Sequence, residues 1–426
     1  MKGAAVTVLK LMLVTGLMAF VFSKIEFADR LVRLNQAGEI VSEQEGDIEG
    51  PWNGQVVRFV TESGEAQEVV KGPQADGTEL QIEPGFLTYW RNMDLSLFAL
   101  GAFCYFLTVL IAGSRWWWLL RVNGTDVSLF ETLRFTWIGV FFNTVVPGAT
   151  GGDLVKALYI MKRCPGHRPQ VLVSVIVDRL LGLASLAILG AIVVLFALDD
   201  FGEIALAIWG VIFAVGLMGL VAFSKRLRQL VRLKALLEKL PQRIGHVLKM
   251  VDRAVFFYRD HKGVIVASLL AGVLNHVVSV LSVILIADAM GVGMPWFECF
   301  VLVPVINIVS ALPIAPQGWG VGEYLYYELF SRYGAAHLGN VANAGLVMGT
   351  RGAALSVLYR LQLTFWSLLG GLFVLFEKDR VTKADIEHEV ELEQQEEAQG
   401  EASGSSGDAG SAEAAESGSP PQHQDR

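Results

Sequence analysis

Cysteine is scarce in this chain of 426 residues, which contains only Cys104, Cys164 and Cys299. No CxxC pair occurs, and none of the three cysteines lies in the polar segment that follows the first apolar run. The sequence therefore supports neither a disulfide framework nor a zinc site. We expect no metal and no cofactor.

The chain also lacks the signatures of nucleotide binding and covalent catalysis. The run 148–153 does not end in the Gly-Lys-Ser/Thr of a P-loop, and the run 318–323 follows an apolar segment rather than a strand of a βαβ unit. No Ser/His/Asp arrangement stands out. We therefore expect no catalytic residues, no enzymatic activity and no nucleic-acid partner.

Charged residues make up only 18% of the chain, whereas 53% of it is hydrophobic. Several apolar stretches reach or approach the ~20 residues that cross a bilayer as a helix. The net charge of −8 is unevenly spread, because residues 377–426 hold 14 acids and 4 bases and the remainder carries about +2. The acidity therefore belongs to one tail and not to the membrane body.

The apolar runs divide the chain into four parts. Residues 1–23 form an N-terminal membrane anchor helix, since the cleavage pattern of a signal peptide, the alternative, is missing. Residues 24–94 are polar, with short β-like runs between glycines, and form a β-rich extracytoplasmic insert. Residues 95–376 form the transmembrane domain, and the polar residues 377–426 form a disordered acidic cytoplasmic tail.

A basic stretch interrupts the transmembrane domain at residues 225–261. Residues 225–262 hold 11 Lys and Arg against three acids, and their leucines recur at helical spacing. This pattern predicts a cytoplasmic amphipathic helix on the membrane surface, and an ordinary connector is a compatible alternative.

Basic loops stay in the cytoplasm and so fix the orientation of each apolar segment. The segment 128–156 has basic flanks on both sides, which begin at Arg115 and at Lys156, so we expect it to enter the membrane and return. The segment 296–333 does the same from the opposite face. We predict an all-α polytopic protein of the plasma (inner) membrane, with about six full transmembrane helices, both termini cytoplasmic, and two oppositely oriented re-entrant hairpins arranged like an inverted repeat.

Each hairpin is broken at its centre by proline and glycine, followed by an acid. The first break contains Asn143, Pro147, Gly148, Gly151, Gly152 and Asp153, and the second contains Asn307, Pro313, Gly318, Gly320 and Glu323. Proline removes a helix donor and glycine lets the chain turn. Transporters with inverted repeats bind substrate where broken helices meet. We therefore expect a site at the breaks, and kinks that only aid packing are the alternative.

Glycine N–H groups and helix N-termini attract anions such as phosphate, whereas Asp153 and Glu323 repel them. The two acids therefore cap the following helices, bind a cationic headgroup or carry a coupled proton. Charges within membrane segments are usually functional, which adds Lys156, Arg179 and Arg351 as partners of a phosphate or an acid. Structural pairs such as Asp153–Arg351 or Glu323–Arg179 are the alternative. The predicted substrate-binding residues are Asn143, Pro147, Gly148, Gly151, Gly152, Asp153, Lys156, Asp178, Arg179, Asn307, Gly318, Gly320, Glu323 and Arg351.

The ordered run Phe141–Lys156, together with Val177-Asp-Arg179 and Pro313–Glu323, resembles the lysylphosphatidylglycerol synthase transmembrane-region family of flippase-like integral membrane proteins. The resemblance covers roughly residues 95–376. It implies transport of a membrane lipid, either an anionic phospholipid or a lipid-linked precursor. Bifunctional members carry a soluble aminoacyl-transferase domain where this chain has an acidic tail, so the resemblance does not extend to aminoacylation.

Two other functions remain open. One is a proton- or ion-coupled transporter of a small solute that uses Asp153 and Glu323. The other is a non-transporting membrane partner of a lipid- or glycan-modifying enzyme, such as a glycosyl- or acyltransferase, docked through the basic helix and the insert. No oligomeric state is predicted.

The predicted topology can be tested by cysteine labelling in intact cells. Cys164 should react only with a reagent that reaches the cytoplasm, whereas a cysteine placed near Gly64 should react with an impermeant reagent from outside. The reverse pattern would refute the re-entrant assignment.

Overall fold

The computed structural model describes residues 27–35, 39–145, 151–196, 260–311, 318–339 and 343–377, with a few isolated positions between them. The predicted crossings at 4–23 and 203–223, the basic helix and nearly all of the acidic tail lie outside the described residues. So do three residues of the breaks, Pro147, Gly148 and Pro313. The chain divides into two compact units, and the description below concerns the first, Met1–Phe376.

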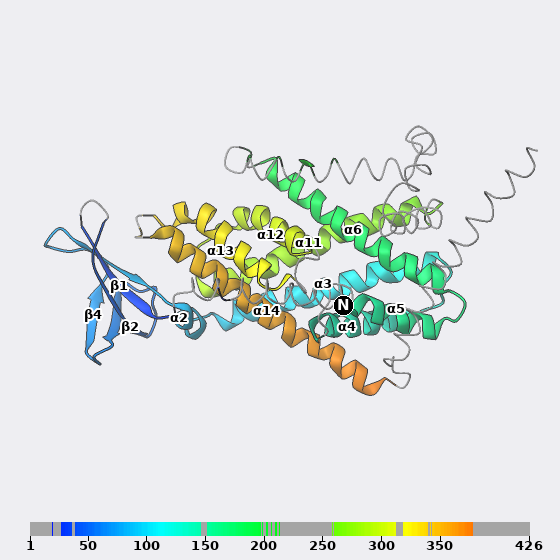
Figure 1. Ribbon diagram of the computed structural model, residues 1–426, viewed down its shortest axis with the longest axis horizontal. Helices are drawn as coiled ribbons and strands as arrows, with labels where there is room; N and C mark the ends of the chain where they lie inside the picture. The colour runs from blue at the N-terminus through cyan, green and yellow to red at the C-terminus, as the bar shows by residue number, and fades with distance from the viewer. Residues whose placement is uncertain are drawn as a thin grey trace, which may run out of the picture. The chain divides into compact units, whose positions relative to one another are not determined.

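The first part of this unit is a six-stranded antiparallel sheet, drawn in blue in Figure 1. Its strands are β1 (Asp29–Leu34), β2 (Ile40–Glu49), β3 (Val56–Thr61), β4 (Ala66–Val70), β5 (Gly72–Pro73) and β6 (Glu79–Glu83), in the order β4-β3-β2-β1-β6-β5. Alternate residues of β3 are buried, as the period of a half-buried strand requires. The sheet lies where the sequence predicts a β-rich insert.

The rest of the unit is helical. Its helices are α2 (Phe86–Arg91), α3 (Leu95–Val122), α4 (Leu129–Val145), α5 (Gly151–Arg163), α6 (Arg168–Val194), α11 (Lys262–Met290), α12 (Trp296–Ser310), α13 (Val321–Gly334) and α14 (Ala344–Phe376), with a 3-10 turn η2 (Ala335–Leu338) before α14.

Four of these helices, α3, α6, α11 and α14, are long and apolar enough to cross a membrane. They coincide with four of the six predicted crossings, and the other two predicted crossings fall outside the described residues. Large apolar side chains remain exposed along them, for example Phe103, Leu270 and Phe365. Exposed apolar side chains are the expected surface of a helix that faces lipid tails. The protein is therefore a multi-pass helical membrane protein.

The helices α4 and α5 form an antiparallel pair on either side of the first break (Figure 1). At the break, the Gly152 amide donates to Asn143 Oδ1 at 2.9 Å. At the far end of the pair, Arg163 Nε lies 3.0 Å from Glu131 Oε1. Helix α4 has 17 residues and α5 has 13, each fewer than the ~20 of a typical crossing helix. The segment predicted as a hairpin is therefore a pair of shorter helices, called half-length below.

The helices α12 and α13 form the equivalent pair around the second break. Ser310, at the end of α12, lies against Gly318 and Gly322, and His337 Nε2, in η2 just beyond α13, lies 3.2 Å from Glu298 Oε1 near the start of α12. The two chain segments therefore run antiparallel here too.

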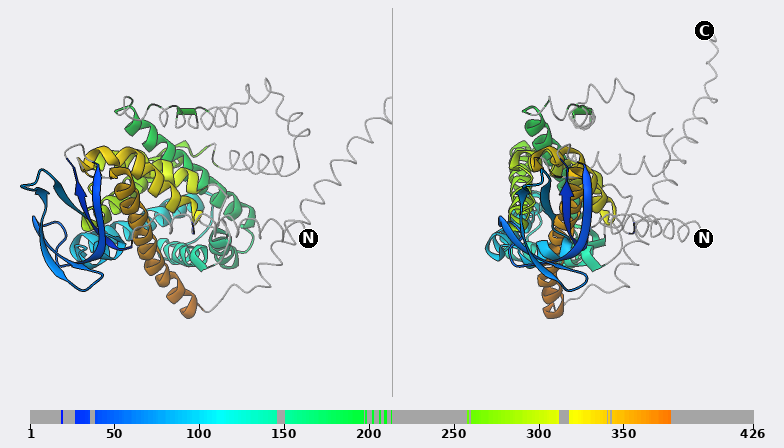
Figure 2. Two further views of the ribbon diagram at one scale, coloured as in Figure 1. Left: turned by 60° about the vertical axis from the view of Figure 1, so that its left-hand side comes forward. Right: turned by 90° about the vertical axis from the view of Figure 1, so that its left-hand side faces the viewer.

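Helices α3 and α11 pack against each other, and each also packs against one half-length pair, α3 against α4 and α11 against α12. Helices α3 and α11 run antiparallel, since the Asp94 amide donates to the Ala289 carbonyl at 2.9 Å and Ser282 Oγ donates to the Gly101 carbonyl at 2.7 Å. The pair α4–α5 packs against α14 and α6, and the pair α12–α13 packs against α6 and α14 (Figure 2). Each half-length pair thus contacts both of the outer long helices.

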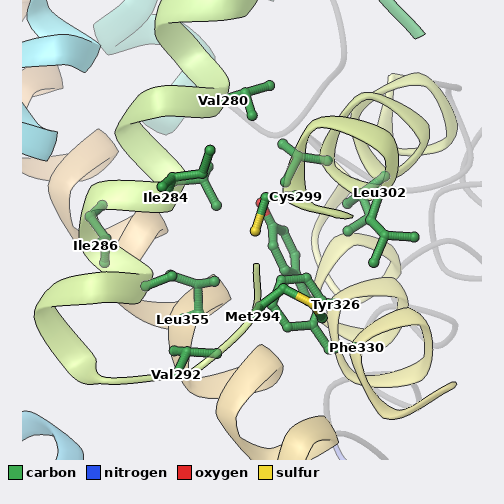
Figure 3. Packing of buried hydrophobic residues seen from close by; sticks show 14 of the residues in the cluster. Val280, Ile284, Ile286, Val292, Met294, Cys299, Leu302, Tyr326, Phe330 and Leu355 are labelled. Atoms are coloured by element: carbon green, nitrogen blue, oxygen red, sulfur yellow. The ribbon is translucent and has the colours of Figure 1, made fainter. Parts of the chain in front are cut away.

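An apolar core fixes the second pair against this frame (Figure 3). Side chains from α11, α12, α13 and α14 meet there, including Ile284, Cys299, Phe330 and Leu355, all of them almost fully buried. Apolar packing therefore helps to hold α12 and α13 against α11 and α14.

One structural detail affects the labelling experiment. The Cys164 thiol is buried, with its Sγ 3.7 Å from the Asp126 carbonyl oxygen. The neighbouring Pro165 is exposed. A cysteine at position 165, in a chain without the natural cysteines, is therefore the better label for the same side.

Candidate functional site

The first break carries an acid that two cations hold. Asp153 is the third residue of α5 and lies 2.9 Å from Lys156 Nζ. Arg179, on α6, donates to the other oxygen of Asp153 through Nε at 2.5 Å, and its Nη2 contacts the same oxygen. The carboxylate is thus fixed between one cation of its own helix and one of the next long helix.

The charges continue in an alternating series into the bundle. Lys156 Nζ lies 4.0 Å from Asp178 Oδ2, and Asp178 Oδ1 accepts from Arg115 Nε at 2.8 Å. Arg115 Nη2 also donates to the Asp178 backbone carbonyl at 3.1 Å. We call Arg179, Asp153, Lys156, Asp178 and Arg115 the ion chain. It contains three cations and two acids, so it carries one net positive charge.

The ion chain is accessible at one end only. The side chain of Arg179 is 42% exposed, whereas those of Lys156 and Arg115 are 9% and 7% exposed. Buried ions are tolerated when each one is paired and hydrogen-bonded. Here the interior ions satisfy one another, and the accessible end of the ion chain is the Arg179 side chain.

An aromatic ring completes the surroundings of the buried lysine. Lys156 Nζ lies 4.5 Å from the centre of the Trp116 ring. Trp116 is fully buried, and its indole N–H donates to Ser174 Oγ at 3.1 Å. The ring face attracts the ammonium group electrostatically, and this attraction is stronger away from water.

Glycines allow the backbones to approach closely at this break. A Cβ atom on Gly152 would lie 2.0 Å from the Gly139 carbonyl oxygen and 2.6 Å from the Asn143 side chain. Any other residue at 152 would therefore push α5 away from α4. The close contact positions Asp153 and Lys156 in the ion chain.

The second break is built in a parallel way. Glu323 is the third residue of α13, is 1% exposed, and accepts from the Gly320 amide at 2.6 Å. Arg360, on α14, contacts Glu323 Oε1 through Nε and donates to the Gly318 carbonyl at 3.0 Å through Nη2. The guanidinium of Arg360 also lies 4.6 Å from the centre of the Trp319 ring.

Backbone conformation explains the glycines of the second break. Gly318 and Gly320 have φ angles of 67° and 77°, a region that glycine adopts without strain. A Cβ on Gly318 would also lie 2.7 Å from the Ser310 carbonyl oxygen. The turn therefore positions the Gly318 carbonyl to accept from Arg360 and the Gly320 amide to donate to Glu323.

The predicted residues fall into three groups. The structure brings Asn143, Gly151, Gly152, Asp153, Lys156, Asp178 and Arg179 together at the first break, and Gly318, Gly320 and Glu323 together at the second, with Asn307 in the last turn of α12. Each acid pairs with an arginine of the next long helix, so the alternative pairs Asp153–Arg351 and Glu323–Arg179 do not form.

Arg351 stands apart from both breaks. Its Nε donates to the Tyr89 hydroxyl at 2.7 Å and its Nη1 to the Val292 carbonyl at 2.8 Å. It lies near the start of α14, against α2 and the turn that follows α11.

The sequence reasoning missed two arginines. The sequence pattern places Arg115 in a cytoplasmic flank, but the structure buries it within α3, because Asp178 neutralises it. Arg360 was not among the predicted site residues, although it lies in an apolar run as Arg179 does. An arginine within an apolar run was the available signal for both.

Among the described residues, no group of three or more His, Cys, Asp or Glu side chains is placed to hold a metal ion. What the ion chain offers instead is a fixed set of N–H donors with excess positive charge. Such a set suits a phosphate or a carboxylate.

The family match covers the helical part of the chain and does not include the sheet. The family described as Lysylphosphatidylglycerol synthase TM region matches residues 85–370. A UPF0104 membrane protein from Pyrococcus horikoshii is 32% identical over 120 residues, which are 28% of this chain and 36% of that protein. The aligned part is thus about a third of that relative.

The contact between α4 and α5 yields a stability prediction. Gly152→Ala should lower the thermal unfolding temperature of the purified protein, because the added methyl overlaps the Gly139 carbonyl and overpacking destabilises by about 1–3 kcal/mol. Gly263→Ala is the matched control, since nothing lies within 4 Å of the Cβ it would add. Equal unfolding temperatures for the two variants would contradict the close contact.

Proposed function

Because the chain belongs to the lysylphosphatidylglycerol synthase TM-region family, we propose that it moves an anionic lipid across the inner membrane. The substrate is an anionic phospholipid or a lipid-linked precursor, and the ion chain at the first break binds its headgroup. The observation that carries the proposal is the series of buried, paired ions that ends at the partly exposed Arg179, where a headgroup can reach it. The activity is transport and needs no covalent step.

The charge balance favours an anionic substrate over a coupled cation. Three cations face two acids in the ion chain, and both acids are already held by cations. An incoming cation would have to displace one of them. An incoming phosphate would instead neutralise the excess charge, and the N-terminus of α5, whose backbone N–H groups point toward the break, adds to the attraction.

The packing of the helices supports an inverted repeat. The order long helix, half-length pair, long helix occurs once as α3, α4–α5, α6 and again as α11, α12–α13, α14. In this correspondence α4 matches α12, α5 matches α13 and α6 matches α14. The contact of α4 with α14 then corresponds to that of α12 with α6, and the contact of α5 with α6 to that of α13 with α14. The two leading helices, α3 and α11, run antiparallel. The two half-length pairs then enter the membrane from opposite faces, with both termini in the cytoplasm.

The acids at equivalent places strengthen the repeat. Asp153 and Glu323 are each the third residue of the second half-length helix, and each pairs with an arginine of the following long helix. Two equivalent pairs, one per repeat, fit a transporter in which one repeat moves against the other to expose the site to each face in turn.

The ion pair at the first break gives the transport step a simple form. The headgroup phosphate replaces Asp153 as the acceptor for Arg179, while Lys156 continues to neutralise Asp153. Binding therefore exchanges one hydrogen-bonded ion pair for another, with no isolated charge left inside the bundle. Release restores the Arg179–Asp153 pair.

The proposal is tested with purified protein in liposomes that contain phosphatidylglycerol bearing a fluorophore, read with an impermeant quencher. Wild-type protein should accelerate transbilayer movement. Arg179→Gln should slow it about tenfold or more, since a hydrogen bond to a charged group contributes about 1.5–3 kcal/mol. Arg163→Gln, on the exposed face of α5, is the matched control and should keep the wild-type rate.

The double variant Asp153→Asn/Arg179→Gln separates transport from structure. It removes one charge of each sign, so a purely structural pair would leave transport near the wild-type rate. A substrate-binding arginine would leave the double variant as slow as Arg179→Gln. Absence of acceleration by the wild-type protein with any anionic lipid tested would refute the proposed function.

A further inference from the structure

The start of α14 holds a buried cation without an acidic partner. Arg351 is only 8% exposed, and its Nε and Nη1 donate to the neutral oxygens of Tyr89 and Val292. Among the described residues it makes no ion pair and no hydrogen bond through Nη2. A buried charge that meets only neutral groups is expensive.

A second cation lies beside the first. Lys71, just after β4, donates from Nζ to the Trp52 carbonyl, and it forms no ion pair with a described acid. Both cations make cation–π contacts with the Trp52 ring, with Lys71 Nζ 5.6 Å and the Arg351 guanidinium 5.4 Å from its centre. We call Lys71 and Arg351 the cation pair.

The two cations affect each other electrostatically. Burial lowers the pKa of Lys71, and the positive charge of Arg351 lowers that pKa further. Both effects oppose the charged form of Lys71. A bound anion would reverse both, because it would neutralise the repulsion and replace the lost water.

Two acids of the sheet lie near Tyr89, and both make hydrogen bonds within the sheet and its flank. Asp29 accepts from the Ile48 amide at 2.6 Å, from the Gly85 amide at 2.7 Å and from Thr88 Oγ1 at 2.7 Å. Glu83 accepts from Arg30 at 2.7 Å. These carboxylates belong to the internal bonding of the sheet and do not neutralise the cation pair.

Contacts with α2 and with the end of α11 fix the position of the Trp52 ring. Its ring lies edge-on to the Tyr89 ring, 5.4 Å between centres, and a Cβ on Gly291 would lie 3.1 Å from it. Gly291 ends α11 with a φ of 68°, so the turn after α11 leaves room for the indole. The sheet and the bundle therefore meet at Trp52, with a cation from each.

We propose that the cation pair binds an anionic group, a phosphate or a carboxylate, at the junction of the sheet and the helical bundle. The free donors are Nη2 of Arg351 and the remaining N–H groups of Lys71, which suit an oxyanion. Trp52 and Lys71 lie outside the family match at 85–370, whereas Tyr89 and Arg351 lie within it. The site is thus completed by the insert of this chain, and it is independent of the ion chain.

The same chemistry fits a lipid headgroup and a soluble anion. Binding is therefore measured on the full chain in two settings. In detergent, the probe is inorganic phosphate, with potassium chloride at equal ionic strength as reference. In nanodiscs, the probe is phosphatidylglycerol, with phosphatidylcholine as reference. A ligand that binds the folded state raises the unfolding temperature, and the concentration dependence gives an apparent Kd.

We expect phosphate, phosphatidylglycerol or both to raise the unfolding temperature of the wild type. Lys71→Gln should weaken the apparent Kd about tenfold, because one charged donor is lost. Lys71→Arg should retain the effect. The control is Lys262→Gln, an exposed lysine at the other end of α11, which should leave the Kd unchanged. Lys71 is tested instead of Arg351, since Arg351 is buried and its loss would disturb the fold.

The two settings identify the source of the anion. A response to phosphate in detergent indicates a soluble anion, and a response to phosphatidylglycerol alone indicates a headgroup. An equal response of the wild type and Lys71→Gln to both probes would overturn the proposal, as would no response of the wild type. Neither result depends on transport, so this test and the liposome test fail separately.

Discussion

The neutralisation of charge inside an apolar bundle is the constraint on which this structure depends. Each ion of the ion chain would be unstable alone at its position, and the series from Arg179 to Arg115 is stable because the signs alternate. Three helices, α3, α5 and α6, contribute to it, so their relative positions are fixed by ions and not by apolar packing alone. The second break uses the same device in a smaller form, with Glu323 and Arg360 joining α13 to α14.

The glycines have a definite place in this arrangement. The acid in the first turn of α5 or α13 reaches its arginine because the backbone before that acid packs very close to α4 or α12. Gly152 permits that approach at the first break and Gly318 at the second, where side chains would overlap the backbone. The unusual composition of the breaks is therefore a consequence of where the two acids must sit.

The sequence predicts the parts of this structure that follow from local patterns. Long apolar runs identify α3, α6, α11 and α14, and glycine-bounded alternation identifies β3, β4 and β6. Strand β2 is not found in this way, because most of its residues are polar and exposed and show no alternation. Intramembrane charge identifies Arg179, but nothing local reveals that Arg351 contacts Tyr89, which is 262 positions away in the chain. Pairing between distant segments depends on the fold and is not written in either segment.

Helix α14 carries both Arg351 and Arg360, nine residues apart, which corresponds to about 13.5 Å along a rigid helix axis. One of these side chains is tied to Trp52 of the sheet, and the other is tied to Glu323. An α-helix resists compression along its axis. A small shift of the sheet along the axis of α14 would therefore displace Arg360, the partner of Glu323, by a similar amount. The sheet is therefore mechanically connected to the interior of the bundle through α14.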